Sequence, residues 1–325
     1  MSGIIGHLTY AILGRQAVLE KAPQIALLID EHLDSYLAGA YFGADIMTLP
    51  GGRCIVCGGE YGYGGNHPDR CPEDHIPLHP YTLTFDGVSY KPQRIHRMFY
   101  GRSHLLFGWQ REQAKFRLEW SQLPDYFEAV VADTFNFYRR PERRVAYVMG
   151  WISHVIGDAL IKSIQPGLDL YLLNGTYTSQ NRPIQDLFSF HHFGRTECQI
   201  DWANLMFNLT ETPVESVQAH FMRLTQPCGQ LAEKFPEGWL PQHKQLLYVV
   251  MGENRRYQKI RTPRLLQQLE LDPITQSCDS ELSRITGGLV FEEMMRMAEV
   301  AKFRQTLTYI GESVGKFLFS SYSKQ

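Results

Sequence analysis

The chain has 325 residues, 44% of them hydrophobic, so it is long and apolar enough to bury a substantial core. Its 32 lysines and arginines against 34 aspartates and glutamates give a net charge of −2, which excludes a generally basic surface for nucleic acid or anionic membrane. No apolar run approaches the roughly 18 residues that span a bilayer, and residues 1–7 lack the features of a signal peptide, so we expect a cytoplasmic protein.

Helical periodicity dominates the chain. Apolar residues recur at helical spacing over residues 4–17, and Pro23 opens a second helix whose apolar stripe continues to Ala40. After an irregular stretch, the pattern predicts helices between Pro92 and Trp109 and over further segments: 124–138, 141–165, 184–208, 213–234, 237–258, 262–270 and 280–319. The sequence therefore predicts an all-α fold, with residues 1–325 forming a single helical domain.

The composition changes abruptly to Gly, Pro, Cys and His over residues 48–91. A loop of this length inside a helical domain is usually functional or tied by a metal. Within it, Tyr81–Tyr90 predicts a short strand pair around Asp86-Gly87. We interpret residues 48–91 as an irregular insertion, either a structural metal loop or a lid over a site.

Three cysteines cluster in this insertion. Cys54 and Cys57 are spaced Cys-x-x-Cys, and Cys71 is followed by His75 with three residues between them. These are zinc-ligand spacings, so Cys54, Cys57, Cys71 and His75 are candidates for a structural zinc site. The alternative is a flexible lid that carries reduced thiols.

His154 and Asp158 lie four residues apart in the apolar helix predicted at 141–165. That spacing places both on one helix face, where they form either a hydrogen-bonded pair in the core or part of a metal site. Histidines and carboxylates in apolar helical contexts recur along the chain: His7, Asp45, His96, His104, His154, Asp158, His191, His192, Glu197 and Asp201. Such a set spread over several helices is typical of a multi-metal site in a helical bundle, and it suits zinc.

Three stretches resemble the zinc-dependent phospholipase C family, which is related to the fungal-type single-strand-specific zinc nucleases. Residues 3–7 (Gly-Ile-Ile-Gly-His) are similar to its Gly-x-x-Gly-His, whose histidine is a ligand. Residues 36–46 are similar to its small-residue stretch ending in Pro-Asp-Ile, with Asp45 in the position of the bridging carboxylate. Residues 150–158 are similar to its Gly-x-x-x-His-x-x-Gly-Asp, in which the histidine and the aspartate are both ligands.

The resemblance implies an all-helical phosphoester hydrolase whose zinc cluster activates water to attack phosphorus. Two or three zinc ions would lie at the main site, and the substrate would be a phosphodiester of phospholipid or nucleotide type. Asp45 would bridge metals or act as the base. The implied ligands are His7, Asp45, His104 (with His96 as the alternative), His154, Asp158, either His191 or His192, and Glu197.

The chain departs from the family in two places. It begins Met1-Ser2 where mature secreted members have a metal-binding Trp, and residues 160–166 contain no histidine where the family has one beyond the aspartate. Two other functions therefore stay open: a zinc nuclease-like phosphodiesterase, and a non-catalytic, metal-stabilised helical protein that binds partners. The oligomeric state also stays open.

Overall fold

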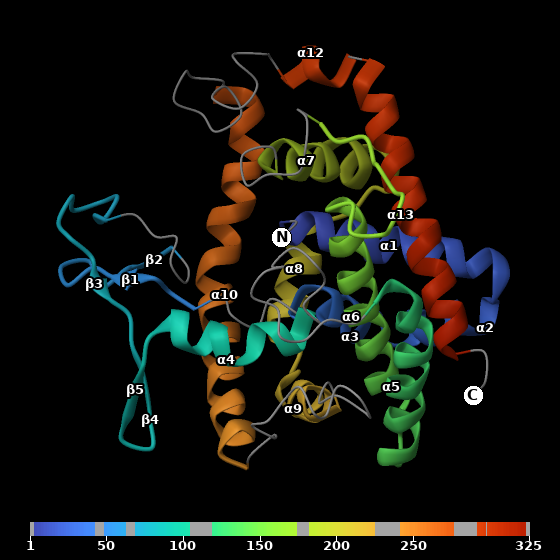
Figure 1. Cartoon of the computed structure of the whole chain (residues 1–325). Coiled ribbons are helices and arrows are strands. Elements are labelled where there is room, and N and C mark those ends of the chain that lie inside the picture. The colour runs from blue at the N-terminus through green and yellow to red at the C-terminus, as the bar shows by residue number, and fades with distance from the viewer. Residues whose placement is uncertain are drawn as a thin grey trace.

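Helices make up most of the computed structural model, which describes residues 3–42, 49–62, 69–104, 119–173, 182–224, 241–275, 291–296 and 298–322. They are α1 (Ile4–Lys21), α2 (Pro23–Glu31), α3 (Leu33–Phe42), α4 (Pro92–His104), η1 (Trp120–Gln122), α5 (Leu123–Phe137), α6 (Glu142–Ile161), α7 (Arg182–Phe188), η2 (Ser189–Glu197), α8 (Trp202–Glu211), α9 (Glu215–Leu224), α10 (Pro241–Thr275), α12 (Phe291–Arg296) and α13 (Ala298–Tyr322). In Figure 1 the strands lie on one side of α10 and most other helices on the other. The predicted all-α class is confirmed.

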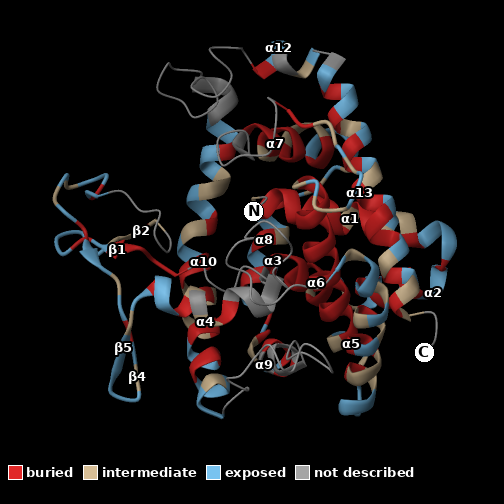
Figure 2. Ribbon diagram, in the orientation of Figure 1, coloured by how far each residue is buried: buried red, intermediate tan, exposed pale blue. Residues whose placement is uncertain are grey.

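Helix α6 lies in the core. Every residue from Val145 to Ile161 is buried, as the red ribbon in Figure 2 shows. A helix that is apolar on all sides must be covered on all sides, and α1, α3, α5 and α13 pack against α6. The burial predicted for the stretch around His154 is therefore confirmed.

Glycines set the distance between α3 and α6. A Cβ atom on Gly150 would lie 1.8 Å from the carbonyl oxygen of Tyr36, and one on Gly39 would lie 2.0 Å from that of Tyr147. No side chain fits in either place, so the two backbones touch. This contact fixes Ala40 beside the middle of α6.

The structure changes three of the predicted helix boundaries. The helix expected from Pro23 is interrupted at His32, whose backbone (φ −131°, ψ 38°) is not helical. The helix expected at 184–208 divides into α7, η2 and α8, because Gln199 adopts a positive φ of 52° and the Asp201 side chain caps α8. The two helices expected at 237–258 and 262–270 are one continuous helix, α10, which buries side chains from both parts and packs against α8 and α9.

The insertion contains the chain's described strands. Strands β1 (Gly52–Arg53), β2 (Glu60–Tyr61) and β3 (His79–Pro80) form an antiparallel sheet in the order β2-β1-β3. The predicted hairpin is confirmed as β4 (Leu83–Phe85) and β5 (Val88–Tyr90), joined by two residues with positive φ, Asp86 and Gly87. Of the helices described, none combines the length and the hydropathy that a membrane crossing requires.

Candidate functional site

Helices α1 and α6 bring two buried histidines into contact. The imidazoles of His7 and His154 stack with their centroids 3.6 Å apart and 10° between their planes. Both side chains are buried, at 3% and 0% exposure. Asp158 follows His154 by one turn of α6 and is also buried. We refer to His7, His154, Asp158 and the neighbouring Lys162 as the histidine cluster.

His7 is a buried histidine whose pKa is lowered, so its ring is neutral. Burial is the main cause that lowers its pKa well below the ordinary value, and the neighbouring His154 lowers it further, while the charge of Asp158 acts in the opposite direction. Among the described residues, neither ring nitrogen of His7 has a hydrogen-bond partner. Leaving such buried atoms unpaired costs free energy, so this ring is a candidate metal ligand.

The backbone fixes the tautomer of His154. Its Nδ1 lies 2.7 Å from the carbonyl oxygen of Ala40 on α3. A carbonyl oxygen only accepts, so Nδ1 carries the proton, and in the neutral ring Nε2 then carries the lone pair. Metal-binding histidines are usually oriented by such a hydrogen bond from their second nitrogen. The α3–α6 contact therefore sets the tautomer of His154 and leaves the lone pair on Nε2.

Asp158 already has a cation beside it. Its Oδ2 forms an ion pair with Nζ of Lys162, and the two side chains are only 8% and 10% exposed. Lys162 is the C-cap residue of α6, so the pair closes the end of the helix that carries His154. Lys162 is not among the predicted site residues, although its spacing of four from Asp158 is an ion-pair signal.

Two of the other predicted ligands fall outside what the structure describes. Asp45 lies beyond the end of α3, outside the described residues, and His104 ends α4 with a side chain that is not described. His96 lies on α4, half-buried, and α4 packs against α9. The structure therefore brings together His7, His154 and Asp158 from the predicted set.

Glu197 pairs with His192 and not with His191. Residues 189–197 form a π-helix, in which side chains five apart lie on one face, and Nε2 of His192 is 3.0 Å from Oε1 of Glu197. Nε2 of His191 instead lies 2.8 Å from the carbonyl oxygen of Leu269. Glu197 also pairs with Arg304 of α13, so this group forms an ion-pair network on the surface of the bundle.

A second cluster forms in the insertion. Cys54, Cys57, Cys71 and Asp74 each contribute one ligand atom, and these atoms lie within 4.8 Å of one another, so the group could hold a metal ion. The Cys57 and Cys71 sulfurs are 3.8 Å apart, and Asp74 Oδ2 is 3.0 Å and 3.5 Å from the Cys54 and Cys71 sulfurs. In tetrahedral zinc sites, with Zn–S bonds of about 2.3 Å, two sulfur ligands are about 3.8 Å apart. We refer to these four residues as the cysteine cluster.

Backbone donors surround the three sulfurs. Amide groups of Val56, Gly59 and Asp74 donate to the sulfurs of Cys54, Cys57 and Cys71 at 3.4, 3.3 and 3.3 Å. For Cys71, burial opposes ionisation but the backbone donors outweigh it and lower the pKa. Burial and the Asp74 carboxylate raise the pKa of Cys54 to about 11. At Cys71 the backbone donors therefore favour the thiolate, the form that binds metal, whereas the surroundings of Cys54 favour the thiol.

The fourth position of the cysteine cluster differs from the prediction. His75 is exposed, with a positive φ of 56°, and Asp74 takes its place in the cluster. The backbone turns sharply after Cys71, where the amide of His75 donates to the Cys71 carbonyl oxygen. The spacing Cys71-x-x-Asp74 repeats that of Cys54-x-x-Cys57, and this repeat is the signal that the sequence analysis missed.

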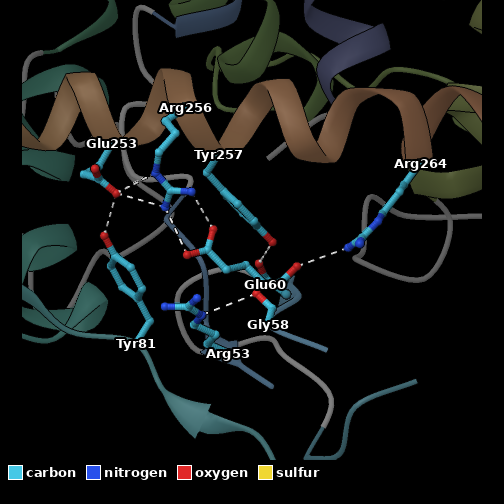
Figure 3. Close-up of polar contacts among 9 residues, drawn as sticks. Arg53, Gly58, Glu60, Tyr81, Glu253, Arg256, Tyr257 and Arg264 are labelled. Carbon is cyan, nitrogen blue, oxygen red and sulfur yellow. Dashed lines mark hydrogen bonds and ion pairs between the residues drawn. The ribbon is translucent and has the colours of Figure 1, made fainter. Parts of the chain in front are cut away.

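The insertion is fastened to α10 by polar contacts, drawn in Figure 3. Glu60 of β2 accepts two hydrogen bonds from the Arg256 guanidinium, at 2.8 and 3.1 Å. Tyr81 donates to Glu253 at 3.0 Å, and Tyr257 donates to the carbonyl oxygen of Gly62. Arg264 donates to the Glu60 carbonyl oxygen at 3.2 Å. One face of α10 therefore holds β2, the strand that lies between Cys57 and Cys71 of the cysteine cluster.

Tyr61 links the cysteine cluster to this face. Its hydroxyl lies 3.5 Å from the Cys57 sulfur and donates to Glu73 at 3.0 Å, while the Arg264 guanidinium lies 4.9 Å from its ring centroid. Tyr61 also belongs to a small separate core with Cys54, Cys71 and Leu78. The geometry of the cluster and the contact with α10 therefore share one side chain.

Comparisons with known proteins do not identify this chain. No family model, curated protein or solved structure matches it. Within the described ranges, the cysteine cluster is the one group of at least three cysteine, histidine or carboxylate ligands with metal-binding proximity.

Proposed function

We propose that this chain is a zinc-dependent phosphoester hydrolase of the phospholipase C type, with its active site at the histidine cluster. The observation that carries the proposal is the buried contact between His7 and His154 beside Asp158. Two stretches far apart in the sequence, each similar to a ligand motif of that family, place their histidines ring to ring. Burying the unpartnered imidazole of His7 costs free energy, and binding a ligand would offset that cost.

The histidine cluster offers residue types that zinc binds, although its ligand atoms do not have the mutual proximity that those of the cysteine cluster have. His7 offers a neutral ring with two nitrogens that lack partners among the described residues, and His154 offers Nε2 with its tautomer set by Ala40. Asp158 supplies a buried carboxylate. Two imidazoles and a carboxylate are donor types that a zinc ion accepts. Ligands for a further ion would come from Asp45 and His104, whose side chains lie outside the described structure.

The residues of the chain have separate tasks in this proposal. His7, His154 and Asp158 hold the ion, and Ala40 orients His154. Zinc bound there would supply Lewis acidity toward a phosphoryl oxygen and would make water more acidic. Asp45 is the proposed bridging carboxylate or base.

Hydrolysis assays on three substrates test the proposal. Zinc-loaded protein is incubated with bis(p-nitrophenyl) phosphate, phosphatidylcholine vesicles and single-stranded DNA, with and without a chelator. We expect chelator-sensitive release of p-nitrophenol, and cleavage of either the lipid or the DNA decides between the phospholipase C and nuclease types. If none of the three substrates is cleaved while zinc is bound at the histidine cluster, the proposal of a hydrolase is rejected.

We also propose that the cysteine cluster binds one structural zinc through Cys54, Cys57, Cys71 and Asp74. Among the described residues of the insertion, the separate core consists of Cys54, Tyr61, Cys71 and Leu78, which is too small to hold its shape without a metal or another cross-link. This zinc has four protein ligands and leaves no open position for a substrate. Its role is therefore to hold β1 and β2 against α10.

A second function is favoured by one specific observation. The cysteine cluster is the described group with the spacing of a metal site, whereas Asp158 already has Lys162 as its counter-ion. A non-catalytic helical protein, stabilised by one zinc in the insertion, has these properties. Zinc that stays at one equivalent in His154→Ala but is lost in Cys57→Ser would select this second function.

A further inference from the structure

The ion pair between Asp158 and Lys162 sits in an unusual place for two charges. Both side chains are at least nine-tenths buried at the end of α6, one to two turns after His154, and the charges of both act on His7. A buried ammonium requires a compensating charge, and Asp158 provides it. The charge of Lys162 also reaches His7, whose pKa it lowers.

A metal ion at Asp158 and the Lys162 ammonium are alternatives in electrostatic terms. Each is a cation attracted to the same carboxylate, and two cations a few ångströms apart in a dry site repel each other strongly. The segment after Asp158 contains no histidine to support a metal there, and it contains Lys162 instead. The ion pair therefore supplies the positive charge with the chain's own side chain.

We infer that Lys162 replaces a metal cation at Asp158, so that the histidine cluster binds fewer zinc ions, and binds them less tightly, than the same ligands would without it. This inference rests on the proposed function for the identity of the site. Lys162 is then the residue that sets how many zinc ions the cluster binds. Asp158 forms its ion pair with the Lys162 ammonium whenever no metal ion is bound to Asp158.

Zinc titration of three variants tests this inference, with the cysteine cluster intact in each. Lys162→Met removes the ammonium and keeps the length of the side chain, Lys162→Arg keeps the cation, and Lys162→Met/Asp158→Asn removes both charges. We expect Lys162→Met to bind zinc at least tenfold more tightly than the wild type, or to take up one more equivalent. The Arg variant and the double variant should show no such gain.

Two further outcomes decide the question if Lys162→Met is unstable. Rescue of its folding by zinc, measured as the helical circular dichroism signal and Tm, supports the inference, because zinc then compensates Asp158. No gain in zinc affinity, or no rescue, overturns it. The proposed function is rejected by a different result, the absence of phosphodiesterase activity in the wild-type protein. That result would reject the hydrolase even if Lys162→Met binds more zinc.

Discussion

His7 of α1 and His154 of α6 lie face to face, with 3.6 Å between their ring centroids, at a point where both side chains are buried. Helix α3 supports this contact from the other side through the Ala40 carbonyl oxygen. Because α3 and α6 touch through glycines, a small shift between these helices would move His154 relative to its backbone acceptor. The packing of the core and the geometry of the histidine cluster are therefore coupled.

Gly150→Ala should strongly destabilise the fold. Its new methyl group would lie 1.8 Å from a backbone carbonyl oxygen of α3, so α6 has to move away. We expect a loss of roughly 3 kcal/mol or more in the free energy of unfolding, measured by urea denaturation. Gly252→Ala on α10 is the matched control: nothing lies within 4 Å of its Cβ, so it should stabilise by about 0.5–1 kcal/mol. Equal effects of the two substitutions would contradict the close helix contact.

Cys57→Ser should release the insertion from α10 without affecting the histidine cluster. The Cys57 sulfur is a proposed zinc ligand, and Tyr61 beside it carries the contact with Arg264. We expect loss of one zinc equivalent and rapid proteolysis within residues 49–91, followed by mass spectrometry. The control is Cys198→Ser, because Cys198 lies outside the cysteine cluster. An insertion that resists protease equally well in Cys57→Ser would show that metal does not hold it.

The metal-free protein should lose stability in acid through His7. Its pKa in the folded chain lies well below the ordinary value of 6.5, so below that pH the unfolded chain binds a proton that the folded chain does not. The free energy of unfolding therefore falls as the pH drops below 6.5, by up to about 1.4 kcal/mol per pH unit from this residue. His7→Gln should remove this contribution from the slope, as measured by urea denaturation in chelator between pH 5 and 7.

The control for the substitution itself is His79→Gln, the same change at an exposed histidine of β3. A slope that is the same in His7→Gln and the wild type would show that His7 is not held neutral by burial.

The helical fold could be predicted because its signals are local. The sequence shows these signals directly: the apolar positions of α1 and α6, Pro23 at the start of α2, and the Asp86-Gly87 turn. The break at His32 and the continuity of α10 could not be predicted, because they depend on which tertiary surface each segment packs against.

Some residues of the candidate sites could be predicted from local spacing, and others depend on the folded structure. Cys54, Cys57 and Cys71 could be predicted from spacing, but the choice of Asp74 over His75 depends on the turn after Cys71, which places His75 outside. Likewise the partner of Glu197 could not be chosen from sequence, because the π-helix that brings His192 to it is a rare conformation without a spacing signal.

Zinc content measured together with phosphodiesterase activity, in wild type, His154→Ala and Cys57→Ser, tests the central proposal most directly. We predict at least two equivalents of zinc in the wild type. In His154→Ala, zinc is lost from the histidine cluster and activity falls by at least about 100-fold, whereas Cys57→Ser loses one equivalent and stays active. One equivalent of zinc in the wild type, retained in His154→Ala and lost in Cys57→Ser, would contradict a catalytic histidine cluster.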